Sequence, residues 1–155
     1  MLERDLGIQR GIAKWAEIDP RAASAWVAQM PEGIARDYAS MNLISNWSRY
    51  QSQAAADWIR SLQDGHQRDV AIEEFVRSNA VRDGAAAWDL AMTVTDQGKR
   101  IFVQSLAMGA WAEQEPVKAE AALTAMEEVP NDVSSAYASA IETREAWREF
   151  FLGRR

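Results

Sequence analysis

The sequence has no cysteine, one histidine, four prolines and no long run of apolar residues. Without cysteine the chain has neither disulfides nor thiolate metal ligands, and its compartment stays open between the cytoplasm and the periplasm. No apolar run approaches the ~20 residues that a membrane-spanning helix needs, so we expect no membrane partner. No secretory apolar segment follows Met1, which slightly favours the cytoplasm.

Residue patterns that carry chemistry are also scarce. The net charge is −6 and no Lys/Arg cluster occurs, so nucleic acid is not an expected partner. His66 lies in a turn signal, where a solvated residue is expected instead of an acid–base catalyst. No phosphate loop, nucleophile elbow or metal-ligand spacing is present. The sequence therefore predicts no enzyme, no catalytic residue, no metal and no cofactor.

What the chain does contain is a 32-residue internal period, marked by tryptophan. Trp15 and Trp47 lie one period apart, and Trp111 lies two further periods along the chain. Trp26 and Trp58 repeat the interval at a second position of the period. A fixed period of this length is typical of stacked units, none of which buries its apolar face alone. We therefore expect these five tryptophans to be packed in the core.

Each unit is predicted to contain two helices. Asp19-Pro20 has the pattern of an N-cap followed by proline in the first helical turn. Gly33 and Gly65 are expected just past the second helix of their units, in the left-handed conformation that often ends helices. Apolar residues recur at three- and four-residue spacing, and strand-type alternation is absent. The predicted helices span residues 3–17, 20–30, 34–49, 52–63, 67–81, 84–95, 98–113, 116–128 and 132–151, so the fold class is all-α.

These units predict one domain over residues 1–155, an α-solenoid (α-α superhelix). Four 32-residue helix-pair repeats are assigned to residues 2–33, 34–65, 66–97 and 98–129, and a C-terminal capping helix to residues 130–155. The cap is expected to include Trp147, Phe150 and Phe151. The alternative is that these aromatics form an exposed end that binds the next repeat or a second copy. Because the chain begins at a repeat boundary, a piece of a longer array is slightly favoured over a complete protein.

An arginine, usually followed by aspartate, marks the start of each unit and has two interpretations. The positions are Arg4-Asp5, Arg36-Asp37, Arg68-Asp69 and Arg100. A recognition ladder is one interpretation. We favour a structural role, with the arginine near the C-terminal end of the preceding helix and the aspartate in the first turn of the next. Each charge suits the helix dipole at that place.

Trp88 departs from the period and defines the candidate binding face. At about 100° per residue it points away from the predicted core stripe of the second helices, and Met92 follows one turn later. An aromatic residue and a methionine on an outward face are typical of an interface. The alternative is a two-residue shortening of the preceding turn, which returns Trp88 to the core. The candidate partner-binding residues are Trp88, Met92, Arg60, Arg21, Gln53 and Glu120.

The unit WAEIDPRAASAWVAQMP resembles helix-pair repeats of uncharacterised bacterial proteins, with Trp-Ala, Asp-Pro, Ala-Ala and Trp at matching spacing. The resemblance covers most of the chain. In length and topology the unit is similar to the tetratricopeptide and HEAT class, although the Gly and Tyr positions of the tetratricopeptide consensus are not reproduced. The resemblance implies a partner-binding scaffold without chemistry of its own, which is an inference from fold alone.

The expected function is a non-catalytic protein- or peptide-binding scaffold that uses the face lined by the second helix of each repeat. One alternative is a structural segment of a longer array, or a module that self-associates through its terminal repeats. Another is an enzyme, which requires a deep pocket holding polar groups with perturbed pKa values.

Overall fold

The computed structural model describes residues 11–152, and over that range every regular element is an α-helix, which confirms the predicted all-α class. Residues 11–18 are helical. The helices that follow are α2 (Pro20–Ala28), α3 (Ile34–Tyr50), α4 (Ser52–Ser61), α5 (His66–Asn79), α6 (Gly84–Ala91), α7 (Gln97–Gln114), α8 (Pro116–Thr124) and α9 (Asn131–Leu152). None of the helices within residues 11–152 combines the length and apolarity needed to cross a bilayer. The predictions made for residues 1–10 and 153–155 lie outside the described residues.

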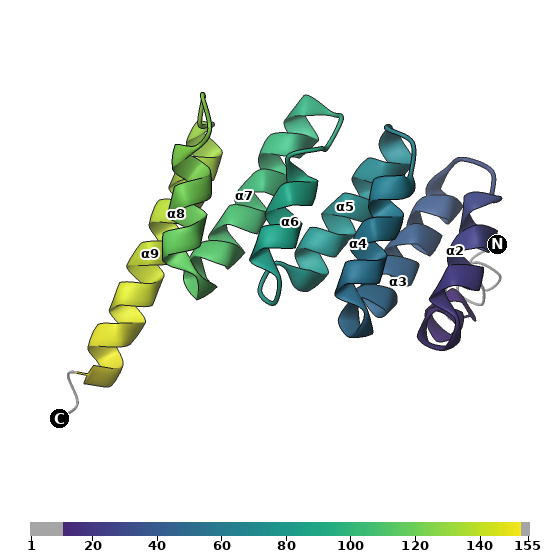
Figure 1. Cartoon of the computed structure of the whole chain (residues 1–155), viewed down its shortest axis with the longest axis horizontal. Helices are drawn as coiled ribbons and strands as arrows, with labels where there is room; N and C mark the ends of the chain where they lie inside the picture. The colour runs from purple at the N-terminus through teal and green to yellow at the C-terminus, as the bar shows by residue number, and fades with distance from the viewer. Residues whose placement is uncertain (1–10, 153–155) are drawn as a thin grey trace.

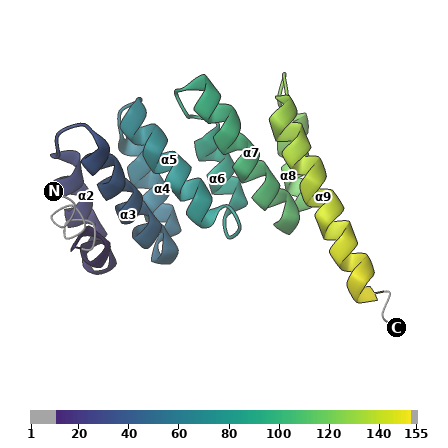
Figure 2. The same ribbon diagram turned by 180° about the vertical axis from the view of Figure 1, so that it is seen from behind.

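The helices form two layers along a single row (Figure 1). The front layer consists of α2, α4, α6 and α8, and the rear layer of α3, α5, α7 and α9. Figure 2, seen from behind, brings the rear layer forward. The rear helices pack side by side in chain order, and each of α4, α6 and α8 packs against the rear helix before it and the one after it. The apolar core lies between the two layers.

The front-layer helices begin at even intervals. They start at residues 20, 52, 84 and 116, in successive steps of 32. Asp19 caps α2 by accepting a hydrogen bond from the Ala22 N–H at 3.0 Å, and Asp83 caps α6 through the Ala86 N–H at 3.2 Å. A cap that satisfies a free N–H fixes where a helix starts. The predicted Asp-Pro start of α2 is therefore confirmed.

The front-layer helices are shorter than predicted. α6 ends at Ala91 and α8 at Thr124, whereas the apolar pattern predicted ends at residues 95 and 128. The apolar residue that closes each unit donates its N–H to the carbonyl three residues earlier, which tightens the chain into a turn. These closing residues are Met30, Leu62, Val94 and Met126. They pack on the core although they lie in the turn, so the apolar pattern continues past the last residue of the helix.

Gly33 and Gly65 have a different role from the predicted one. Their φ angles are 139° and 141° with ψ near extended, a region that is essentially restricted to glycine. Each is the N-cap of the following rear helix. The Gly33 carbonyl, for example, accepts hydrogen bonds from the N–H groups of Arg36 and Asp37. The prediction that these glycines end the preceding helix in the left-handed conformation is therefore wrong.

The core stripe of the front layer is wider than the predicted one and includes the position of residue 24. In α2 the buried residues are Ala23, Ser24 and Val27, and the equivalent residues of α4 are buried too. Trp26, which the predicted stripe includes, is 40% exposed. The core therefore lies on the side of residue 24, which is the position that Trp88 occupies in α6.

Trp88 is buried as a consequence, with 6% of its surface exposed. The prediction that it points away from the core is wrong, and it is not available as an exposed interface residue. Its burial does not come from a shortened turn either, because α6 begins in step with α4 and α8. In α6 both Leu90, at the position of Trp26, and Trp88, at the position of Ser24, are buried, so the predicted stripe was too narrow.

Tryptophans at one position of the period differ in burial. Trp47 and Trp111 are 3% and 6% exposed, as predicted, but Trp15 is 37% exposed. The core prediction is therefore wrong for Trp15 and Trp26. The indole of Trp111 lies against α6, where a Cβ built on Gly84 would be 2.3 Å from it. No front-layer helix precedes Trp15 among residues 11–152, so Trp15 lacks the equivalent cover.

The Arg and Asp of the period hold the turns between helices. Asp69 is buried and accepts hydrogen bonds from the N–H groups of Thr95 and Asp96 at 2.8 and 3.0 Å. Arg100 donates to the Val94 carbonyl at 3.3 Å, at the end of the preceding unit. These contacts lie within the fold and support a structural role over a recognition ladder. The first pair of the series is outside the described residues.

α9 covers the end of the row with its first half only. The apolar residues of that half that pack on the core are Val133, Tyr137, Ala140 and Ile141. Every residue from 142 to 152 is exposed, and this half extends past the other helices (Figure 1). Trp147 is 58% exposed and its ring stacks on that of Phe151 at 5.7 Å. The prediction that Trp147, Phe150 and Phe151 form part of the cap is therefore wrong.

Candidate functional site

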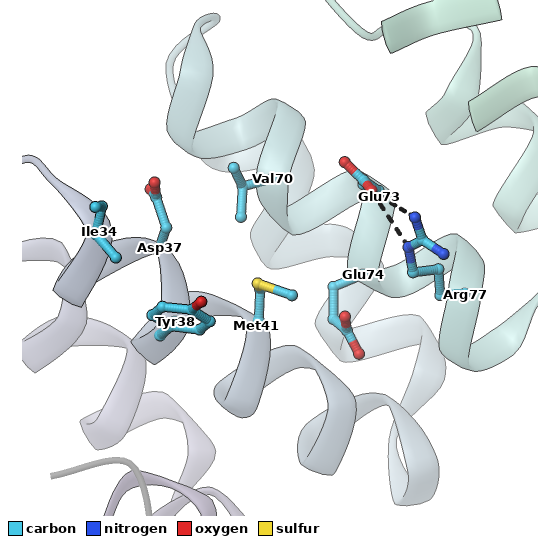
Figure 3. A pocket seen from close by; sticks show the side chains of 8 residues that line it. All are labelled: Ile34, Asp37, Tyr38, Met41, Val70, Glu73, Glu74 and Arg77. Carbon is cyan, nitrogen blue, oxygen red and sulfur yellow. Dashed lines mark hydrogen bonds and ion pairs between the residues drawn. The ribbon is translucent and has the colours of Figure 1, made fainter. Parts of the chain in front are cut away.

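A groove of about 320 Å³ lies in the rear layer, between α3 and α5 (Figure 3). The residues that line this α3–α5 groove are Ile34, Asp37, Tyr38, Met41, Val70, Glu73, Glu74 and Arg77. Ile34 and Tyr38 are exposed at its edge, by 75% and 49%, whereas Val70 is buried. The groove therefore combines an accessible apolar surface with three carboxylates.

The α3–α5 pair has smaller side chains than the α5–α7 pair at two positions of the period. Val70 occupies the position of the 32-residue period that Tyr38 holds in α3 and Phe102 holds in α7. Between α5 and α7 the guanidinium of Arg77 lies over the Phe102 ring, 5.3 Å from its centre. The counterparts of Phe102 and Arg77 in the α3–α5 pair are Val70 and Ser45, so this cation–π contact has no equivalent beside the groove. This difference within the period is the sequence signal that could have identified the groove.

Glu73 connects the groove to the neighbouring helix. Its carboxylate accepts a hydrogen bond from Arg77 Nη2 at 2.8 Å and pairs with Lys99 of α7 at 3.3 Å. Burial acts to raise the pKa of Glu73, but hydrogen bonds from Arg77 and Lys99 outweigh it and hold the pKa below its ordinary value. Glu73 is thus an ionised residue of the fold, and its charge is balanced by two cations.

Asp37 and Glu74 carry the negative charge that is left in the groove. Asp37 lies 2.9 Å from Nε2 of His66, and Glu74 accepts a hydrogen bond from the Ser78 hydroxyl at 2.9 Å. Among residues 11–152 neither carboxylate forms an ion pair with arginine or lysine. The His66 side chain is 70% exposed, as predicted, but the residue is the first of α5 and does not lie in the turn. The groove is therefore apolar with two accessible acids.

A second groove, of about 490 Å³, lies in the front layer between α2 and α4. The residues that line this α2–α4 groove are Arg21, Ser24, Trp47, Gln53, Ala54, Asp57 and Trp58. Gln53 Nε2 and Arg60 Nη1 both donate to Oδ1 of Asp57 at 2.9 Å. Three residues of the predicted binding face, Arg21, Gln53 and Arg60, are thus brought together here.

Two tryptophans form the aromatic part of the α2–α4 groove. The rings of Trp47 and Trp58 are 6.0 Å apart and tilted by 44°. Trp47 is buried, and its indole N–H has no hydrogen-bond partner. At the equivalent place in α7, the indole N–H of Trp111 donates to Oε2 of Glu115 at 3.1 Å. The residue four positions after Trp47 is Gln51, which does not accept that bond.

The other residues of the predicted face are not part of this groove. Trp88 is in the core, as described for α6. Met92 is 42% exposed, and its sulfur accepts a hydrogen bond from Gln104 Nε2 at 3.0 Å. Glu120 is exposed on α8. The pKa of the nearby Tyr137 is raised, first by the burial of its own side chain and second by the charge of Glu120. The structure therefore places Arg21, Gln53 and Arg60 on α2 and α4, apart from Trp88 and Met92 at the end of α6 and from Glu120 on α8.

Within the described part of the chain, no group of three or more His, Cys, Asp or Glu residues is arranged to hold a metal ion. Comparison of the chain with family models, with curated proteins and with solved structures gives no match. The two grooves are therefore interpreted from their own geometry and chemistry.

Proposed function

We propose that this chain is a short α-solenoid of four 32-residue helix pairs closed by α9, and that it acts as a non-catalytic scaffold for a peptide partner. The even spacing of the front-layer helix starts and the two-layer row support the repeat architecture. Stacked helix pairs present extended surfaces on which a partner segment can lie. The observation that carries the binding proposal is the open α3–α5 groove.

The partner segment fits the chemistry of that groove. Ile34 and Tyr38 offer exposed apolar area, and the space above Val70 accommodates an apolar anchor side chain. Asp37 and Glu74 lie on the lining and favour a basic residue next to the anchor. The partner is therefore a segment that carries an aliphatic or aromatic anchor beside a lysine or arginine.

This proposal moves the binding face from the front layer, where the sequence had indicated it, to the rear layer. The front-layer prediction depended on Trp88 as an exposed anchor, and Trp88 is buried. The rear layer offers Tyr38 in its place, an aromatic residue that is 49% exposed and lies beside a groove.

Selection from a displayed peptide library followed by calorimetry of the selected peptides tests the proposal. Selected sequences should share an apolar anchor next to a basic residue. Val70→Phe fills the groove with the side chain that Phe102 places one period later, and it should weaken binding at least about tenfold. Val117→Phe, at a position on α8 that is 78% exposed, is the matched control and should bind as the unmodified chain does. Peptides that bind Val70→Phe without loss would refute the proposal.

Self-association is the second candidate function, and the exposed aromatic ends favour it. Trp15 and Trp26 pair at 6.4 Å at one end of the row, and Trp147 stacks on Phe151 at the other. Contiguous exposed apolar area often marks an interface. Light scattering over a range of concentrations decides the matter: a concentration-independent monomer removes this candidate.

A further inference from the structure

The α2–α4 groove contains a buried hydrogen-bond donor that the fold does not satisfy. The indole N–H of Trp47 has no acceptor although the residue is only 3% exposed. The hydroxyl of Ser52, at the first residue of α4, is likewise buried without a partner. Buried polar groups in folded proteins are nearly always paired, so the unpaired indole of Trp47 in the lining of this groove indicates an acceptor supplied from outside.

The equivalent corner two units later shows what that acceptor is. The Trp111 indole donates to the carboxylate of Glu115, the N-cap residue of α8. Gln51 is the N-cap residue of α4 and makes no side-chain cap bond. The fold therefore tolerates a carboxylate beside this indole, at the positive end of a front-layer helix. At Trp47 the chain does not provide it.

The groove also contains a cation that is free to pair with a carboxylate. Arg21 is exposed and forms no ion pair among residues 11–152. Asp57, the acid on the opposite wall, is already held by Arg60 and Gln53. The charge that the groove presents to an incoming group is therefore positive, although the chain as a whole carries −6.

We infer that the α2–α4 groove binds the glutamate side chain of a partner polypeptide. Its carboxylate accepts the hydrogen bond of the Trp47 indole and pairs with Arg21, and its methylene groups lie on Trp58. A glutamate side chain is the occupant because the equivalent position next to Trp111 is filled by the side chain of Glu115. This site lies in the opposite layer from the α3–α5 groove and does not depend on the function proposed for that groove.

Nuclear magnetic resonance of the full chain tests the inference through the indole N–H signals. The Trp47 signal is assigned by its loss in Trp47→Phe. The probe is a capped alanine pentapeptide with a central glutamate, added at millimolar concentration. It should shift the Trp47 indole signal and leave that of Trp111 in place. The same peptide with a central glutamine should produce no shift, because it lacks the charge that pairs with Arg21.

Two substitutions sharpen this test. Gln51→Glu copies the Glu115 arrangement, so it should move the Trp47 signal without peptide and weaken peptide binding about tenfold, by occupying the site. Arg21→Gln, at an exposed position, should weaken binding by a similar factor. Glu115→Gln is the control: it should change the Trp111 signal and leave peptide binding as it is. Val70→Phe should also leave this binding intact, which separates the two grooves.

Four results would overturn the inference. They are a Trp47 signal that does not move with the glutamate peptide, equal shifts with the glutamine peptide, unchanged binding to Gln51→Glu, and a response only to an uncapped peptide. The last would assign the site to a chain-terminal carboxylate instead of a glutamate side chain.

Discussion

Tryptophans in the centre of the row and tryptophans at its two ends differ in how far they are buried. Trp47 and Trp111 in the centre are 3% and 6% exposed, whereas Trp15, at the same position of the period, is 37% exposed. The contact of Trp111 with Gly84 gives the reason. A tryptophan of a rear helix is buried by the front helix of the unit before it. Burial in this fold therefore depends on having a neighbour in the row, and the sequence position alone does not provide it.

The C-terminal end shows the same dependence along one helix. Ala140 of α9 is 5% exposed where α7 lies beside it, but all residues from 142 onward to 152 are exposed. Arg144 donates to the Glu113 carbonyl, near the end of α7. Past that contact no other helix of residues 11–152 covers α9, and its aromatic residues are exposed.

Trp88→Ala should have the largest effect on stability. Removing a buried tryptophan from the centre should lower the free energy of unfolding by about 3–5 kcal/mol, through lost burial and the cavity left behind. Trp26→Ala, in the front helix at the end of the row, should cost about 1–2 kcal/mol because 40% of that residue is exposed already. Urea denaturation measures both. Equal losses for the two variants would contradict the distinction between centre and end.

Gly84→Ala should have the second-largest effect on the free energy of unfolding. Alanine normally stabilises a helix relative to glycine by roughly 1 kcal/mol, but here the new Cβ would lie 2.3 Å from the Trp111 ring. Overpacking of this kind should lower the free energy of unfolding by about 1–3 kcal/mol. Gly98→Ala in α7, whose Cβ would meet only the Asp96 carboxylate at 3.5 Å, is the control. It should be neutral or stabilising when both variants are measured by urea denaturation. A neutral Gly84→Ala would contradict the tight contact between Gly84 and the Trp111 ring.

Glu73→Gln should have a smaller effect on stability than Gly84→Ala, and one that depends on pH. The pKa of Glu73 is lowered in the folded state, so its ionised form stabilises the fold above the carboxyl pKa of the unfolded chain. That contribution is lost as the pH falls through the folded-state pKa. The melting temperature of Glu73→Gln should therefore lie below that of the unmodified chain at pH 7 and converge with it in acid.

The end of the row provides the matched substitution. Glu17 pairs with Lys14 at 2.7 Å within one exposed helical segment, and exposed pairs of this kind contribute little. Glu17→Gln should therefore leave the melting temperature nearly unchanged at pH 7. A larger loss for Glu17→Gln than for Glu73→Gln would reverse the expected order of centre and end.

Local signals predicted the helices well. Asp19 and Asp83 satisfy the first N–H groups of α2 and α6, and such caps act within a few residues of the chain, so the sequence contains all that they need. Gly33 was recognised as a special position, but its positive φ serves the start of α3 instead of the end of α2. The direction in which a turn glycine acts depends on the path of the chain after it.

The sites were harder to predict than the helices. Arg21 and Gln53 were predicted to share one outward face, and in the structure both line the α2–α4 groove. They occupy the same position of the period in helices that start 32 residues apart. Trp88 was assigned to the wrong side, since the predicted core stripe left out the position of residue 24, which is buried in α2, α4 and α6. The α3–α5 groove was missed, because it lies between two helices that only stacking brings side by side.

The sequence by itself determined the all-α class, the helix starts and the 32-residue spacing, because caps, turns and apolar periodicity act over short distances along the chain. Tertiary structure alone decided which tryptophans are buried, where the grooves open and which polar groups are left without a partner. Those properties depend on the helix that stacks next to each residue. Two identical positions of the period can therefore be core in one unit and surface in another.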